Sequence, residues 1–306
     1  MNYELRRKEF FMKNTIFTGA AVAIITPMNY DGSINYNALG ELIETQIANH
    51  TDAIVICGTT GEASTMTDEE HIECIRYAVE KTAGRVPVIA GTGSNDTKYA
   101  IALSKEAEAA GADGLLLVTP YYNKTTQKGL VMHFTAIADA VNIPIILYNI
   151  PGRTGLNMDV ATVKKLAEHK NIAAIKEASG NISYVARLIA ECGDNIDVYS
   201  GNDDMVVPLM SLGGKGVISV ASHIIPKQMH DMVQYCLDNN FAEAMKIQIE
   251  YLDLINNLFI EVNPIPAKES LNMTGFNAGP CRMPLCEMTG EHKEILRESL
   301  KKHGLI

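Results

Sequence analysis

The chain has 306 residues, of which 47% are hydrophobic and 20% are charged. These fractions are typical of a globular protein and exclude a disordered chain. With 26 basic and 36 acidic residues the formal net charge is −10, which argues against nonspecific binding to nucleic acid or to acidic membranes. No apolar run in the sequence reaches the ~18 residues that a membrane span needs.

The N-terminal segment carries three consecutive basic side chains, Arg6, Arg7 and Lys8. It lacks the apolar stretch of a signal peptide. We therefore expect either a short extension over residues 1–12 or a start at Met12.

Eight short apolar runs follow, with starts separated by roughly 20–35 residues, enough for one strand and one helix each. They are apolar throughout rather than alternating, which is typical of parallel strands buried on both faces. The predicted strands are residues 20–25, 53–57, 86–90, 114–118, 144–148, 172–176, 196–199 and 216–220.

Helical patterns lie between these runs. Residues 36–49 place Leu39, Leu42 and Ile43 on one side, and Thr67 with Glu70 three residues later predicts a helix start. The predicted helices are residues 36–49, 67–82, 97–110, 158–169 and 183–191.

Eight strand–helix units predict an α/β protein with a (β/α)₈ (TIM) barrel. An open, doubly wound sheet is the alternative, although it usually needs fewer units. We assign residues 1–239 to the barrel, which would hold the catalytic site. Residues 240–306 show helical pattern without a clear strand, and we expect a C-terminal helical module that packs on the barrel.

In a (β/α)₈ barrel the active site lies at the carboxyl ends of the strands. Polar residues follow the predicted strands at this edge. They occur in the segments 58–62, 119–123, 148–155, 176–180 and 200–204.

Lys176 closes an apolar strand. If its side chain points into the barrel, desolvation lowers its pKa, and a neutral amine can attack a carbonyl to form a Schiff base. The alternatives are a strand-end lysine that reaches solvent, or one paired with Glu177.

Tyr148 ends the preceding strand and could move a proton, or could simply satisfy its own buried hydroxyl. Thr59 and Thr60 lie in a glycine-flanked turn that could bind a carboxylate or cap the next helix. Arg153 follows a Pro-Gly turn, where a guanidinium could bind a substrate carboxylate or remain solvated.

Cofactor and metal motifs are weak. The segment 91–96 lacks the third glycine of a dinucleotide fingerprint. The six cysteines are scattered, and no cysteine–histidine cluster has zinc-ligand spacing. We expect no cofactor, no metal, reduced thiols and a cytoplasmic location.

Six motifs, at these strand ends and in the C-terminal segment, indicate one protein family when they occur together and in this order. The sequence resembles the dihydrodipicolinate synthase family, within the pyruvate-dependent class I aldolases that include N-acetylneuraminate lyase. The resemblance runs from about Phe17 to the C-terminus. It rests on GTTGE (58–62), PYYN (120–123), YNIPGRTG (148–155), IKEASG (175–180), GVISV (216–220) and NPIPAK (263–268).

The resemblance implies a carbon–oxygen lyase that works through a Schiff-base lysine. It would condense pyruvate with L-aspartate 4-semialdehyde in diaminopimelate and L-lysine biosynthesis. Lys176 would form the Schiff base, and Tyr148, Thr60 and Tyr122 would relay protons, with Tyr122 reaching into a neighbouring subunit.

Substrate binding is implied in the same way. Thr59 and Thr60 would hold the pyruvate carboxylate, and Arg153 the carboxylate of the semialdehyde. Gly201 and Ile218 match substrate-lining backbone positions of the family. Because Tyr122 would reach into a neighbouring subunit, the resemblance implies a homotetramer built from tight dimers.

Two other functions stay open. One is an aldolase for N-acetylneuraminate or 2-keto-3-deoxy sugar acids, whose members usually lack an arginine in the loop of Arg153. The other is a catalytically silent barrel that binds a keto acid, which would not need Lys176.

Feedback inhibition by L-lysine is common in the family, and here the match is incomplete. His71, Asn95 and Tyr121 fit positions of lysine-sensitive members. Asp68 and Tyr99 stand where those members carry a histidine and a glutamate. Without that glutamate the lysine ammonium loses a partner, so we expect weak or absent inhibition.

Overall fold

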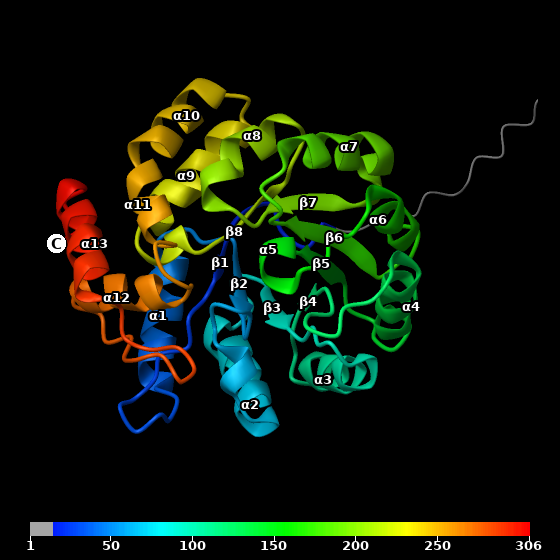
Figure 1. Cartoon of the computed structure of the whole chain (residues 1–306), viewed down its shortest axis with the longest axis horizontal. Coiled ribbons are helices and arrows are strands. Elements are labelled where there is room, and N and C mark those ends of the chain that lie inside the picture. Colours follow the sequence, from blue (N-terminus) through cyan, green and yellow to red (C-terminus); the bar gives the residue numbers. More distant parts are fainter. Residues whose placement is uncertain (1–14) are drawn as a thin grey trace, which may run out of the picture.

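The structure, a computed structural model, describes residues 15–306, so the expectation for residues 1–12 falls outside it. Eight parallel strands pair in chain order and close into a barrel, which confirms the predicted (β/α)₈ fold (Figure 1). The strands are β1 (Gly19–Ala23), β2 (Ala53–Ile56), β3 (Val88–Gly91), β4 (Gly114–Val118), β5 (Ile145–Asn149), β6 (Ile172–Glu177), β7 (Asp197–Ser200) and β8 (Gly216–Ser219).

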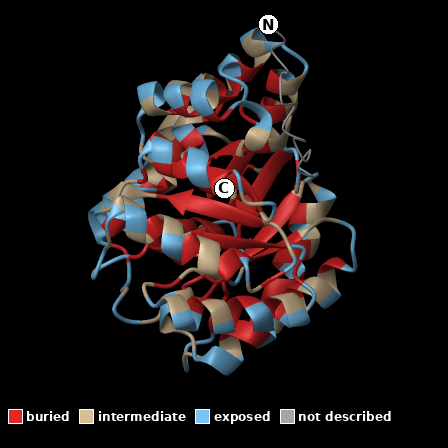
Figure 2. Ribbon diagram, turned by 90° about the vertical axis from the view of Figure 1, so that its right-hand side faces the viewer, coloured by how far each residue is buried: buried red, intermediate tan, exposed pale blue. Residues whose placement is uncertain are grey.

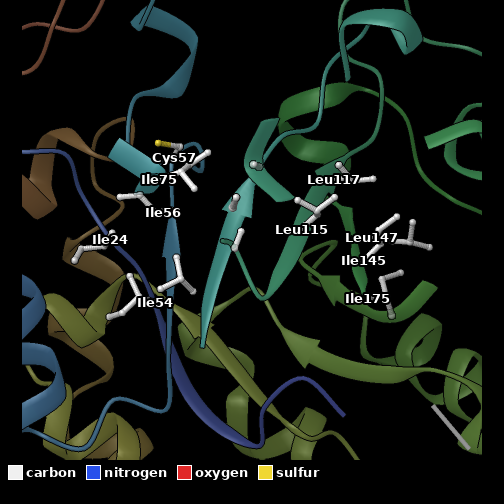
Figure 3. Close-up of a cluster of buried hydrophobic side chains, with 14 of the residues drawn as sticks. Ile24, Ile54, Ile56, Cys57, Ile75, Leu115, Leu117, Ile145, Leu147 and Ile175 are labelled. Atoms are coloured by element: carbon white, nitrogen blue, oxygen red, sulfur yellow. The ribbon is translucent and has the colours of Figure 1, made fainter. Parts of the chain in front are cut away.

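Side chains along each strand point alternately toward the helices and into the barrel, and this divides the core into two parts. Ile54, Leu115 and Ile175 point outward and pack against the helices (Figure 3). Val55, Leu116 and Ala174 belong instead to the cluster that fills the barrel. Because side chains in a strand alternate between faces, this register also decides which residues at the strand ends reach the barrel mouth.

The helices surround the barrel and turn their buried stripes toward it (Figure 2). Those up to the last strand are α1 (Tyr36–Ala48), α2 (Asp68–Thr82), α3 (Thr97–Ala109), α4 (Gln127–Ala138), α5 (Pro151–Thr154), α6 (Val160–Leu166), α7 (Ile182–Cys192) and α8 (Val206–Ser211). Helix α2 begins with the predicted capping box, in which Thr67 and Glu70 bond each other's backbone N–H groups.

Several segments differ from the sequence prediction, and α4 and α8 lie outside the helix ranges that it named. The helix expected over residues 158–169 is shorter, since Asp159 is its N-cap and the N–H of Met158 donates to Asn149 Oδ1 at 3.0 Å. The four-residue helix α5 was not predicted; Pro151 occupies its first turn and Gly155 ends it in the left-handed region.

The chain after β8 is helical. Helix α9 (Pro226–Leu237) is followed by α10 (Phe241–Glu250), α11 (Leu252–Asn257), α12 (Ile265–Met273) and α13 (Gly290–Lys302). Leu254, Leu296 and Leu300 share one buried cluster with Ala20 of β1 and Val217 of β8. We propose the start of the module at residue 240, because α9 still contacts β1 and β8 whereas α13 contacts both α11 and α12.

A buried ionic network joins this module to the loop after β2. Lys268 Nζ lies 2.5 Å from Glu62 Oε1, and both side chains are almost fully buried. Glu62 Oε2 accepts a hydrogen bond from the N–H of Arg282 at 2.8 Å. The Arg282 guanidinium pairs with both oxygens of Glu70 at 2.6 and 2.7 Å. These contacts fix residues near the C-terminus to the segment that starts α2.

We predict that Lys268→Met lowers the free energy of unfolding by about 3–5 kcal/mol, since it leaves the Glu62 carboxylate buried and unpaired. Urea denaturation would measure the loss. Combining Lys268→Met with Glu62→Gln should recover part of the lost stability, because the uncharged amide replaces the unpaired carboxylate. As a control, Lys293→Met breaks the more exposed Glu269 pair, which should cost less than ~1 kcal/mol. Equal costs for the two single variants would contradict the prediction.

Candidate active site

Lys176 lies at the carboxyl end of β6 and is 5% exposed. It has the same strand parity as Ala174, which packs inside the barrel. Glu177 is the next residue and therefore faces the helices, where its Oε2 accepts a hydrogen bond from Asn149 Nδ2 at 2.8 Å. The lysine amine consequently has neither a solvent-exposed position nor an ion pair with its neighbour in sequence.

Tyr148 occupies the matching position of the neighbouring strand. It pairs in register with Lys176, and Lys176 Nζ lies 4.4 Å from the centroid of the tyrosine ring. On the other side, a Cβ at Gly201 would approach Lys176 Cε to 3.0 Å and Ala178 Cβ to 2.7 Å. The absence of a side chain at Gly201 therefore leaves the space in which the lysine chain lies.

Burial lowers the pKa of Lys176 to about 8. Burial is the largest cause of this shift; the Asp203 carboxylate opposes it and the Arg153 guanidinium adds to it. Near neutral pH this gives roughly two orders of magnitude more neutral amine than an ordinary lysine has. Burial raises the pKa of Tyr148, so its phenol holds its proton and can donate it.

The threonine turn closes another side of the site. Thr60 is buried, and its Oγ1 accepts a hydrogen bond from Asn263 Nδ2 at 2.8 Å, whereas Thr59 is exposed. The turn is held by Thr26 Oγ1, which donates to the carbonyl of Gly61 at 2.8 Å. Glu62 leaves the turn in the left-handed region, with a φ of 58°.

Arg153 belongs to α5 and also lines the site. Its Nη2 donates to the backbone carbonyl of Asn263 at 3.2 Å, and its side chain is otherwise exposed. A guanidinium in this position can bind a carboxylate that enters from solvent.

These groups line one pocket of about 350 Å³. It brings together five of the sequence-predicted residues, namely Lys176, Tyr148, Thr59, Thr60 and Arg153, with Gly201 beside them. Ile218 lies deeper, in the buried cluster inside the barrel. An enclosed amine, a phenol, a hydroxyl and a guanidinium around one small cavity suit a keto acid and a second anionic reactant.

Tyr122 is not part of this constellation. Its side chain is 93% exposed, it lines neither pocket at this edge of the barrel, and its backbone has a φ of 67°. Any role in catalysis would require a second chain.

A second pocket of about 430 Å³ adjoins the first and shares Thr59, Tyr148 and Arg153 with it. His71, Tyr99 and Tyr121 line it. Asn95 lies beside them, and its Nδ2 donates to the Tyr121 carbonyl at 3.1 Å.

The two residues that depart from the lysine-sensitive pattern contact each other there. The Tyr99 hydroxyl donates to Asp68 Oδ1 at 2.5 Å. The carboxylate at position 68 is thus already engaged by the residue that replaces the expected glutamate.

Two residues of the site were not singled out from the sequence. Asp203 is buried in the lining of the first pocket, and its Oδ2 accepts from the N–H groups of Val220 and Ala221, both at 2.9 Å. Asn263 belongs to the C-terminal segment. Asp203 lies in the segment 200–204, and Asn263 begins the motif NPIPAK. In neither case does a local pattern distinguish the residue from its polar neighbours.

No group of three or more His, Cys, Asp or Glu side chains within residues 15–306 is arranged to hold a metal ion. Over the same residues, none of the helices combines the length and the apolar content that a membrane span requires.

Comparison with known proteins decides the family. The model of the dihydrodipicolinate synthetase family matches residues 16–303. The chain belongs to this family. The 4-hydroxy-tetrahydrodipicolinate synthase of Acetivibrio thermocellus is 60% identical over 295 residues, covering 96% of this chain and all of that protein.

Solved structures of the dihydrodipicolinate synthetase family superpose closely. A dihydrodipicolinate synthase from Acinetobacter baumannii, complexed with pyruvate, matches with a TM-score of 0.94 and 44% identity over 95% of this chain and all of that one. The enzyme from Cyanidioschyzon merolae with lysine bound matches with a TM-score of 0.93 and 43% identity over 96% of this chain and all of that one.

We predict that Asp203→Asn lowers the pKa of Lys176 below about 8, because it removes the carboxylate that favours the ammonium form. Competitive labelling of amines at a series of pH values, read by mass spectrometry of the Lys176 peptide, measures this pKa. Asp204→Asn, at the exposed neighbouring carboxylate, serves as a matched control. An unchanged or raised pKa in Asp203→Asn would show that the electrostatic assignment is wrong.

Proposed function

We propose that the chain catalyses the 4-hydroxy-tetrahydrodipicolinate synthase reaction, the condensation of pyruvate with L-aspartate 4-semialdehyde that leads to diaminopimelate and L-lysine. It is a lyase of the class I aldolase type. The observation that carries the proposal is the enclosed Lys176 amine, 4.4 Å from the Tyr148 ring centroid in a pocket that also holds Thr60 and Arg153.

The first half of the reaction uses the low pKa of Lys176. The neutral amine attacks the ketone of pyruvate, water leaves, and an imine forms. The protonated imine withdraws electrons, so the methyl group loses a proton and becomes an enamine. Thr59 and Thr60 would hold the pyruvate carboxylate, and Tyr148 would move protons at these steps.

In the second half the enamine carbon attacks the aldehyde of the semialdehyde. The amino group of the new adduct then attacks the imine carbon, the ring closes, and Lys176 is released. Arg153 would bind the carboxylate of the semialdehyde from the solvent side of the pocket.

Three further proposals accompany this activity. Gly201 and Ile218 form part of the substrate-lining wall. The chain works as a homotetramer of tight dimers, since the exposed Tyr122 can join the relay only in a neighbouring subunit. The location is cytoplasmic, in keeping with six free cysteines.

We also propose that L-lysine inhibits weakly or not at all. His71, Asn95 and Tyr121 would be available to it, but Asp68 bonds to Tyr99, and no carboxylate stands at position 99.

Lys176→Ala is expected to abolish turnover of pyruvate and the semialdehyde without unfolding the barrel, because no other amine replaces the nucleophile. Borohydride reduction in the presence of pyruvate should trap an adduct on the Lys176 peptide of the wild type and none in the variant. Lys165→Ala, at an exposed lysine of α6, is the control. Wild-type protein without an adduct would indicate a silent barrel, and faster turnover of N-acetylneuraminate would indicate a sugar-acid aldolase.

Arg153→Ala should reduce kcat/KM for the semialdehyde by roughly ten- to a hundredfold, the value of a lost charged hydrogen bond, while trapping of the pyruvate imine stays largely intact. Steady-state kinetics and the borohydride assay measure the two steps separately. Arg187→Ala, on the exposed face of α7, controls for the loss of a surface charge. Equal damage to both steps would show that Arg153 has a structural role instead.

A further inference from the structure

The side-chain amide of Asn263 uses only one of its two ends within the protein. The residue is 6% exposed, lies two residues before helix α12 and lines the pocket of Lys176. Its Nδ2 donates to Thr60 Oγ1 at 2.8 Å, whereas its Oδ1 is buried and has no hydrogen-bond partner among residues 15–306. Buried polar atoms almost always have a partner, because an unmade hydrogen bond costs free energy. The oxygen is therefore an acceptor that a molecule bound in the pocket can satisfy.

The surroundings of this oxygen indicate which part of the substrate reaches it. The backbone carbonyl of Asn263 accepts a hydrogen bond from Arg153 Nη2 at 3.2 Å. Arg153 is the residue proposed above to bind the carboxylate of the second reactant. In L-aspartate 4-semialdehyde the carboxylate and the ammonium are attached to the same carbon atom. A carboxylate at Arg153 therefore brings the ammonium close to Asn263.

An amide oxygen suits this amine better than a carboxylate does. The proposed reaction ends when the amino group attacks the imine carbon, and the ammonium must lose a proton before this step. An amide oxygen accepts an N–H from the ammonium and from the neutral amine alike, and it carries no charge. A carboxylate would favour the ammonium form and raise the pKa of the amine. An uncharged acceptor can thus hold the amine until the ring closes.

Two carboxylates in the same pocket, those of Asp203 and Asp204, are the rival acceptors. Asp203 Oδ1 also lacks a hydrogen-bond partner within residues 15–306, but this carboxylate acts on the amine of Lys176, whose pKa it raises. Asp204 is exposed. In the described part of the chain neither carboxylate forms a hydrogen bond or an ion pair with Arg153, whereas Asn263 bonds to it directly. The contact with the arginine favours Asn263.

We propose that Asn263 Oδ1 binds the α-ammonium of the aldehyde substrate, so that the site selects an amino aldehyde. Arg153 and Asn263 then recognise the two charged groups on one carbon atom. The other end of the same amide holds Thr60, which would bind pyruvate. This inference rests on the proposed function and adds to it a residue that sets the class of the second reactant.

The test compares L-aspartate 4-semialdehyde with succinic semialdehyde, which has the same aldehyde and carboxylate but no amino group. Both aldehydes meet the same pyruvate enamine on Lys176, so damage to pyruvate binding affects them equally. The enamine is formed with stoichiometric pyruvate, mixed with either aldehyde and quenched with borohydride. Mass spectrometry of the Lys176 peptide follows the loss of the pyruvate adduct and gives a second-order rate constant for each aldehyde. Their ratio is the selectivity for the amino group.

Asn263→Ala should lower this selectivity roughly tenfold or more, the value of a lost hydrogen bond to a charged group. Loss of the Thr60 contact alone would slow both aldehydes and leave the ratio unchanged. Asn263→Asp keeps an acceptor and adds a charge, so its selectivity should stay at or above the wild-type value. Asn263→Ser, which also lacks the carbonyl oxygen, replaces the alanine variant if that one does not fold. The control is Asn277→Ala, at an exposed asparagine of the same segment, which should not change the ratio.

The outcomes are distinguishable. A folded Asn263→Ala variant whose selectivity stays within twofold of wild type overturns the inference. If the loss appears instead in Asp203→Asn or Asp204→Asn, the ammonium belongs to that carboxylate and the inference is equally wrong. Each of these results leaves the proposed function intact, because the wild type still forms the pyruvate adduct on Lys176 and turns over the amino aldehyde. A wild type without that adduct overturns the function itself.

Discussion

The site depends on the burial of the Lys176 amine at the carboxyl end of β6. Strand β6 alternates between the barrel interior and the helix layer, and this alternation directs Lys176 inward and Glu177 outward. Burial then lowers the pKa of the amine, and Asp203 limits how far it falls. A shift of one residue in the register would exchange the lysine and the carboxylate, and the pocket would lose its nucleophile.

The barrel supplies the reactive groups, but part of their arrangement comes from elsewhere. The turn with Thr59 and Thr60 is one example. It is secured by polar bonds to residues between Asn263 and Arg282. The C-terminal helices are therefore part of the site as well as a cover for β1 and β8. Buried polar contacts of this kind specify one geometry because any alternative leaves a charge or an amide without a partner.

The sequence predicted the fold well because apolar runs, caps and glycines act over short distances. It also located Lys176, Tyr148, Thr60 and Arg153, because strand ends in a barrel converge on one edge. It did not single out Asn263, whose partner lies 203 residues away, since local patterns carry no information about such a contact. Asp203 was missed for a related reason: its burial and its bonds to Val220 and Ala221 follow from the closure of the barrel. Tyr122 is exposed in the single chain, so the role proposed for it depends on a neighbouring subunit.

The bonds from Lys268 and Arg282 to Glu62 have a consequence for the order of synthesis. A ribosome releases the threonine turn long before it makes Lys268 and Arg282, the residues that hold the turn in place. Until then the turn keeps the bond from Thr26 but lacks these two anchors, even if all eight strands have already paired. A chain that stops before Lys268 would therefore carry the nucleophile without these bonds around it, so that the ordered site is completed only after Arg282 has been translated.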